Sequence, residues 1–284
     1  MTMKKQVKYL LSTLVITTPI ITLISCGSTA SFSSQFLSGD QANIDKYVKI
    51  NPTIEINGPN NTKTNYFSFT LDLSSTNLTE IPENAFYSAE SRTYTKAGTG
   101  DQKNISVVYY LSKIIFPASL KTIEKRAFFL DPAIYNEQQR KLELDFSKAT
   151  ALTTIKKQAF KNNQISSLVL PNSLQFIEDE AFASSNIQKI SFAIPQSNVE
   201  LSKIGVGAFF NNQLTNLDLE KAKNLTSIAK AAFKKNKISS IKLPTEFINQ
   251  LTINEEAFSE NPIKKEDVVI TDKDKVIFDA SAFK

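Results

Sequence analysis

Histidine and tryptophan are absent from this 284-residue chain, and cysteine occurs once. Without histidine the chain cannot form a Ser-His-Asp triad, a Cys-His dyad, a histidine general base or a His-ligated zinc site. A lone cysteine excludes an intramolecular disulfide and every multi-cysteine metal site. The seven glycines form neither the GxGxxG nor the GxxxxGK(S/T) phosphate-binding pattern. These absences predict a binding protein rather than an enzyme, with no catalytic residues, metal or cofactor.

The excess of positive charge is small. Lysine and arginine number 33 against 28 acidic residues, for a formal net charge of +5. Residues 1–25 carry three lysines and no acid, so their removal would lower the net charge to +2. An excess this small gives no reason to expect nucleic-acid binding. Hydrophobic residues make up 41% of the chain, which is enough to build a folded core.

The N-terminus has the pattern of a secretory signal. Lys4, Lys5 and Lys8 form a basic segment, and residues 9–23 are apolar or hydroxylated. That run is short for a transmembrane helix and suits the hydrophobic region of a signal peptide. The following Leu23, Ile24, Ser25 and Cys26 resemble a bacterial lipobox.

The lipobox resemblance implies a defined processing event. Residues 1–25 would be removed as a lipoprotein signal peptide, and the thiol of Cys26 would carry a covalent diacylglycerol. The protein would then be lipid-anchored on the extracellular face of the cell membrane, because two acyl chains suffice for stable anchoring. The alternative is an uncleaved N-terminal anchor in which Cys26 has no role. Residues 26–45, rich in serine and small side chains, are expected to form a flexible tether.

One signature recurs through the rest of the chain: an aliphatic residue, three variable residues, then Ala-Phe. Successive phenylalanines are separated by 42, 32, 22, 27, 24, 25 and 25 residues, and the later steps fit leucine-rich repeats. We therefore expect an N-terminal cap and first strand over 46–76 and a repeat solenoid over 77–284, with insertions at 87–110 and 129–141. The anchors are Phe86, Phe128, Phe160, Phe182, Phe209, Phe233, Phe258 and Phe283.

The unit extends around its anchor to LxxIxxxAFxxNxIxxLxLP. The IxxLxL half alternates as a half-buried strand does, and proline closes it because proline cannot donate to a ladder. The LxxIxxxAF half fits either a tight helical or 3₁₀ turn or a second short strand with a turn, with phenylalanine wedged between coils. A row of asparagines and one serine should bond the backbone of adjacent coils: Asn163, Ser185, Asn212, Asn236 and Asn261.

These repeats resemble the BspA-like, or Treponema pallidum type, leucine-rich repeat family over residues 69–284. The family motif is close to LxxIxLPxxLxxIGxxAFxxCxxL, and this chain has Asn or Ser where the motif has Cys. The resemblance implies a mostly β solenoid with a parallel sheet on one face and short helical or 3₁₀ turns. Together with the lipobox, it implies a bacterial, mollicute-like surface lipoprotein of the adhesin type that binds a host or neighbouring-cell protein or glycan.

The candidate binding face consists of strand positions that point away from the core, because solenoids bind through faces shared by adjacent repeats. Tyr94 and Tyr109 are added from the first insertion, since insertions in repeats often lie on the binding face. The candidates are Lys113, Asp145, Lys189, Asn216, Asp218, Lys242, Tyr94 and Tyr109.

Three alternatives remain open from the sequence. Lysines after the anchors, including Lys156, Lys161, Lys230 and Lys234, could form a positive stripe for a sulfated glycan, although Glu180 lies in the same part of the repeat between them. A solenoid end without a polar capping repeat could support end-to-end self-association and a structural role. An accessory lipoprotein that captures a small molecule is the third class.

Overall fold

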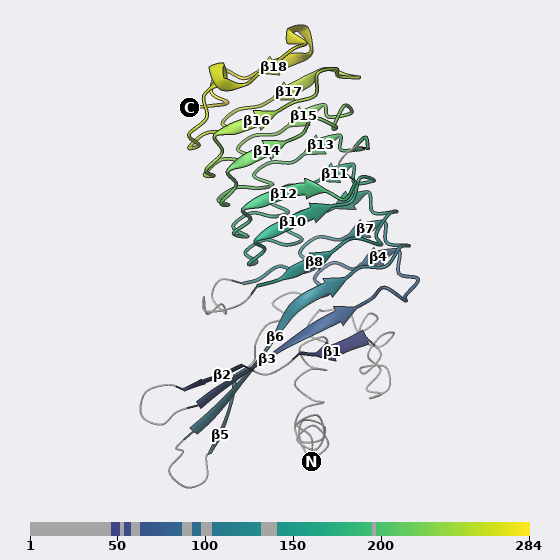
Figure 1. Ribbon diagram of the computed structural model, residues 1–284, viewed down its shortest axis with the longest axis vertical. Coiled ribbons are helices and arrows are strands. Elements are labelled where there is room, and N and C mark those ends of the chain that lie inside the picture. Colours follow the sequence, from purple (N-terminus) through teal and green to yellow (C-terminus); the bar gives the residue numbers. More distant parts are fainter. Residues whose placement is uncertain are drawn as a thin grey trace.

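The computed structural model describes residues 47–51, 54–57, 63–86, 93–97, 104–131, 141–194 and 197–284. These residues form an elongated stack of coils that runs from the N-terminal strands to the C-terminal end (Figure 1). One continuous core extends through the stack, from Val48 to Ala282. The predicted repeat solenoid is therefore confirmed. Within the described segments, no helix has the length and apolar character needed to cross a membrane.

One face of the stack is a parallel sheet made of very short strands. Each strand has two or three residues and usually ends on the isoleucine of the repeat, which is buried. This arrangement decides between the two conformations that the sequence left open, in favour of a short strand followed by a turn. Among the described residues the sheet has eight strands: β4 (Glu80–Ile81), β7 (Thr122–Ile123), β9 (Thr154–Ile155), β11 (Phe176–Ile177), β13 (Lys203–Ile204), β15 (Ser227–Ile228), β17 (Leu251–Ile253) and β18 (Val276–Phe278).

The opposite face carries the predicted IxxLxL strands, also parallel (Figure 1). The structure thus contains the expected parallel sheet and adds a second one. The strands of this face fall into separate ladders. They are β3 (Lys63–Asp72), β6 (Asn104–Ile115) and β8 (Glu143–Asp145) in one ladder, β10 (Ser167–Leu170) with β12 (Lys189–Phe192), and β14 (Asn216–Asp218) with β16 (Ser240–Lys242).

The N-terminal end is built differently from the coils. β1 (Val48–Ile50) and β2 (Ile54–Asn57) both pair antiparallel with β3, and β5 (Thr93–Ala97) pairs antiparallel with β6. β3 lies within the segment predicted as a cap, and it also pairs in parallel with β6. Near the C-terminus, two 3₁₀ turns precede β18: η2 (Lys265–Asp267) and η3 (Lys273–Lys275).

The anchor phenylalanines form one stack along the core. Successive rings lie 4.9 to 5.4 Å apart between centroids, and nearly all are within 7° of parallel. The alanine before each phenylalanine is almost fully buried, since a larger side chain would keep the coils apart. The expectation that phenylalanine is wedged between coils is confirmed.

The row of asparagine and serine residues ties each coil to the one before it. Asn212 donates to the carbonyl oxygen of Phe182 (2.8 Å), and its own Oδ1 accepts from the backbone N–H groups of Ser185 and Ile187. Asn163, Ser185, Asn236 and Asn261 donate in the same way to the phenylalanine carbonyl one coil earlier. Buried polar groups need such partners, so the row stabilises the stacking and is confirmed as structural.

The turns before most anchors contain a backbone conformation that most residues avoid. The residue before Ala-Phe has a positive φ in seven coils, and the residues there include Gln158, Glu180, Gly207 and Ala231. The left-handed conformation costs a non-glycine residue about 1–2 kcal/mol. The coil geometry imposes this conformation whatever side chain is present.

Candidate functional site

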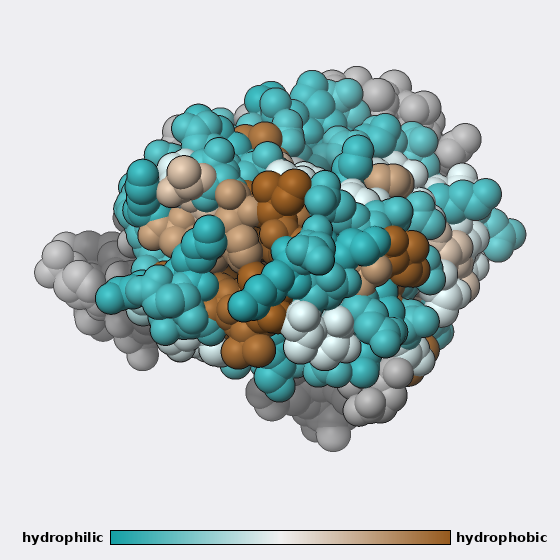
Figure 2. All heavy atoms as spheres, turned by 90° about the horizontal axis from the view of Figure 1, so that it is seen from above, coloured by the Kyte–Doolittle hydropathy of each residue, from teal (hydrophilic) through white to brown (hydrophobic). Residues whose placement is uncertain are grey.

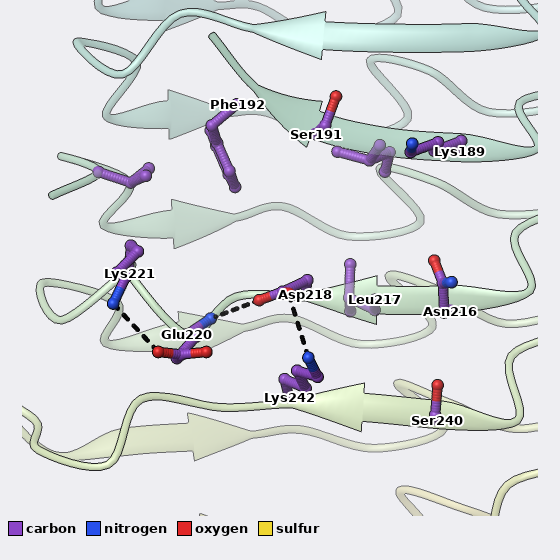
Figure 3. A pocket seen from close by; sticks show the side chains of 12 residues that line it. Lys189, Ser191, Phe192, Asn216, Leu217, Asp218, Glu220, Lys221, Ser240 and Lys242 are labelled. Carbon is purple, nitrogen blue, oxygen red and sulfur yellow. Dashed lines mark hydrogen bonds and ion pairs between the residues drawn. The ribbon is translucent and has the colours of Figure 1, made fainter. Parts of the chain in front are cut away.

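A groove opens on the β12, β14 and β16 face, with a volume of about 410 Å³. Four candidate residues line it: Lys189 from β12, Asn216 and Asp218 from β14, and Lys242 from β16. Figure 3 shows Lys189 and Ser191 on one strand, Asn216 and Asp218 on the next, and Ser240 and Lys242 beyond them. The structure thus brings half of the sequence-predicted set to one place.

The floor of the groove is apolar. Ile190 and Leu217 come from the centres of β12 and β14, and Phe192 and Val199 complete the lining. Leu217 and Val199 are buried, whereas Ile190 and Phe192 are only partly buried although they pack on the core. Their equivalents in the preceding repeat, Leu168 and Leu170 of β10, are by contrast buried.

The rim is charged and largely paired. Lys221 contacts Glu220 at 3.0 Å, and Lys242 lies 3.8 Å from Asp218. The hydrogen bond from Lys221, together with its charge, lowers the pKa of Glu220. Asp218 has a second role, because its Oδ1 accepts the backbone N–H of Glu220 at 3.1 Å and so closes the turn after β14.

Sequence reasoning did not single out Val199, Glu220 and Lys221. For Val199 the available signal was the spacing of 27 residues between Phe182 and Phe209, which is longer than the neighbouring steps. That extra length lies between β12 and β13, beside the groove.

The other candidates lie elsewhere on the solenoid. Lys113 of β6 forms ion pairs with Glu143 and Asp145 of β8, which raise the pKa of Lys113 through the hydrogen bond from its ammonium to Glu143. Burial raises the pKa of Asp145, but hydrogen bonds from Ser147 and the charge of Lys113 outweigh it, so the net shift is downward. Lys113 is therefore engaged by two carboxylates, and these three side chains carry a net negative charge.

Tyr94 and Tyr109 occupy the N-terminal strands β5 and β6. The register places Tyr94 opposite Val107, two positions along β6 from Tyr109. The structure does not bring these tyrosines to the groove, which lies several coils away (Figure 1). Cys26 and the lipobox lie outside the described residues.

The lysines of the possible positive stripe are paired across coils. Lys156 contacts Glu124 at 2.9 Å and Lys161 contacts Glu180 at 2.8 Å. Lys230 contacts Glu255 at 2.8 Å, and Lys234 contacts Glu256 at 2.9 Å. These carboxylates neutralise the stripe, which speaks against it as an anion-binding surface.

The C-terminal end exposes apolar groups. Figure 2, which looks down on this end, shows hydrophobic side chains among hydrophilic ones. Ile277 of β18 is 46% exposed, and Phe283, the last ring of the stack, is only partly buried. Self-association through this end stays a prediction from the sequence.

The described residues contain no cluster of histidine, cysteine or carboxylate side chains suited to a metal ion. The carboxylates of the groove are engaged by lysines or by a turn, and the groove offers hydrogen bonding, ion pairing and apolar contact to a ligand. This combination is typical of a protein recognition surface.

One protein-family model matches most of this chain. A family described as BspA type Leucine rich repeat region matches in six copies, over residues 48–134 and 148–284. The crystal structure of the pneumococcal vaccine antigen PcpA is similar at a TM-score of 0.38 and 20% sequence identity. That match covers 67% of this chain and 48% of the antigen chain, which is less than half of the antigen's length. No curated protein matches significantly.

Proposed function

This chain belongs to the BspA-type leucine-rich repeat family, and from this premise we propose that it is a non-enzymatic surface lipoprotein whose solenoid binds a host or neighbouring-cell macromolecule. The observation that carries the proposal is the groove on the β12, β14 and β16 face. It combines an apolar floor with a charged rim, and its lining comes from adjacent coils. Repeat solenoids use such shared faces to bind their partners.

A rigid scaffold supports this role. The stacked phenylalanines and the asparagine row fix each coil relative to the next. Side chains that project from adjacent coils therefore keep their mutual positions before a partner arrives. Such preorganisation lowers the cost of binding, because little side-chain and loop ordering remains to be done.

Solid-phase binding tests the proposal. The full chain would be applied over a range of concentrations to immobilised matrix proteins, glycans and host cells. We expect saturable binding to at least one of these surfaces. Binding that rises linearly everywhere, as it does on a blocked control surface, would contradict the proposal.

The lipid anchor is a separate part of the proposal and rests on Cys26 and the residues before it. Replacing Cys26→Ala removes the thiol that would carry the diacylglycerol, so the variant should leave the membrane fraction or remain unprocessed. Ser25→Ala is the matched control, because it keeps a small residue beside the cysteine and should fractionate as the parent does. Identical fractionation of Cys26→Ala and the parent would overturn the anchor.

A further inference from the structure

We propose that the groove between β12 and β14 holds an extended segment of a partner protein that carries an acidic residue next to an apolar one. The proposal rests on the function proposed above and specifies the partner chemistry at that face. Four observations support it: the way the groove is built, its apolar floor, its unequal charge and its unpaired strand edges.

One side of the groove includes Val199, at the end of a segment that is held in place by hydrogen bonds. The segment after β12 is longer than its counterpart after β10, and Asn172 fastens it. The Oδ1 atom of Asn172 accepts the N–H of Ile194 at 2.9 Å, and its Nδ2 donates to the carbonyl oxygens of Ile194 and Asn198, both at 3.1 Å. Val199 follows directly and is 1% exposed, so the end of the segment is anchored in the core.

The apolar floor is accessible from outside. Ile190 and Phe192 are only partly buried, and Figure 3 shows the side chain of Phe192 extending from β12 toward β14. Two residues further on, Ile194 is 57% exposed. An apolar side chain of a ligand would remove this surface from water, which favours binding.

The charges of the lining favour an anionic ligand. Lysine contributes three side chains and acidic residues contribute two. Lys221 and Lys242 lie beside Glu220 and Asp218, whereas Lys189 has no ion-pair partner among the described residues. A carboxylate of the ligand placed beside Lys189 would give every lysine of the rim an acidic partner. Such charge complementarity between two proteins favours the correct partner and speeds their association.

The strand edges favour a polypeptide over a glycan. Within the described part of the chain, no backbone hydrogen bond joins β12 to β14, although each strand is paired on its other side. β12 and β14 lie too close together to admit a further strand between them, so an extended peptide would lie along the open groove and bond backbone groups at these edges from outside. Phe192 is the single aromatic residue of the lining, so the site offers little ring surface for stacking a sugar.

Two synthetic peptides test the proposal with the full chain. In one, glutamate alternates with leucine, and in the other lysine replaces each glutamate. Fluorescence anisotropy would give the affinity of each peptide for the parent and for Lys189→Glu. Lys203→Glu is the matched control, because Lys203 also begins a strand, is exposed and lacks an ion-pair partner among the described residues, but lies on the opposite sheet.

We expect the acidic peptide to bind the parent more tightly than the basic one. Lys189→Glu should weaken the acidic peptide about fivefold or more and strengthen the basic one, since reversing a rim charge changes the sign of the pairing. Lys203→Glu should change neither affinity. Equal binding of both peptides, absence of binding, or equal effects of the two variants would overturn the proposal.

A second readout separates this proposal from the proposed function. Lys189→Glu would be taken through the same solid-phase panel as the parent. Saturable binding by both proteins with equal affinity would leave the proposed function standing and would remove the groove as its site. Lack of saturable binding by the parent would instead contradict the proposed function itself, whatever the peptides do.

Discussion

The side-chain amide of Asn212 donates to the carbonyl oxygen of Phe182, one coil earlier, at 2.8 Å. The ring of Phe182 stacks on that of Phe209. Asn212 therefore links the row of asparagine residues to the stack of phenylalanine rings. Asn212 is 1% exposed and also accepts two backbone N–H groups. Coil spacing therefore depends on this side chain as well as on the apolar core.

Replacement of Asn212 by alanine should destabilise the protein by about 3 kcal/mol or more, because several buried backbone groups would lose their partner. The matched control is Asn216→Ala, an exposed amide on β14, which should change stability by less than about 0.5 kcal/mol. Urea denaturation of the full chain measures both. Equal midpoints for the two variants would show that the asparagine row is dispensable.

The stacked rings are expected to be the most sensitive core positions. Phe182→Ala removes a fully buried side chain between two stacked rings and should cost about 3–5 kcal/mol. Phe176→Ala removes a ring that is 36% exposed on β11, and its loss should be clearly smaller. The melting temperatures of the two variants measure this difference. An equal drop in melting temperature for Phe176→Ala and Phe182→Ala would contradict the special importance of the stacked rings.

Two opposite substitutions test the left-handed turn position. Ala231 and Gly207 hold the same place in neighbouring coils, with φ of 54° and 58°. Ala231→Gly should stabilise the chain by up to about 1 kcal/mol, and Gly207→Ala should destabilise it by about 1 kcal/mol or more. A Cβ at Gly207 would meet no atom closer than 3.6 Å, so backbone strain alone is measured. Denaturant midpoints that move in the same direction would contradict the prediction.

Acid should weaken the N-terminal strands through Asp72. Burial raises the pKa of Asp72, but hydrogen bonds from Lys49 and Ser74 outweigh it and lower the pKa from 3.8 to about 2. A pKa lowered by folding adds stability that is present above pH 3.8 and is lost as the pH falls toward 2. The melting temperatures of the parent and Asp72→Asn should therefore converge over this interval.

The Lys49→Ala variant tests whether Lys49 helps to lower the pKa of Asp72. It removes the ammonium that lies 2.8 Å from Asp72 and should reduce the pH dependence attributed to that carboxylate. A gap between parent and Asp72→Asn that stays constant from pH 5 to pH 2 would contradict the assignment. The test uses only melting temperature against pH, so it is independent of any ligand.

The periodic parts of the fold were predictable from the sequence. The anchor Phe182 and the polar residue Ser185 recur with their neighbours at fixed offsets, and both rows lie in the core as expected. The short strands were not decided by the sequence, because two residues such as Thr154 and Ile155 are too few to show a strand period. Their pairing arises from the stacking of coils.

The groove was only partly predictable. The repeat pattern identified four of its residues as outward strand positions and placed them on adjacent coils: Lys189, Asn216, Asp218 and Lys242. The lack of pairing between β12 and β14 was hidden, and so was the segment after β12, which Asn172 of the preceding coil holds through its side-chain amide. The left-handed turn residues were also hidden, since glutamine, glutamate and alanine occupy positions equivalent to that of Gly207.

Hydrogen exchange of the full chain, with and without the partner that binds best in the solid-phase panel, is the most direct test of where this solenoid binds. We predict that bound partner slows exchange in β12 and β14, whose facing edges are unpaired, and leaves β11, β13 and β15 of the opposite sheet unchanged. Slower exchange confined to the opposite sheet or to the N-terminal strands, with β12 and β14 unaffected, would contradict binding through this face.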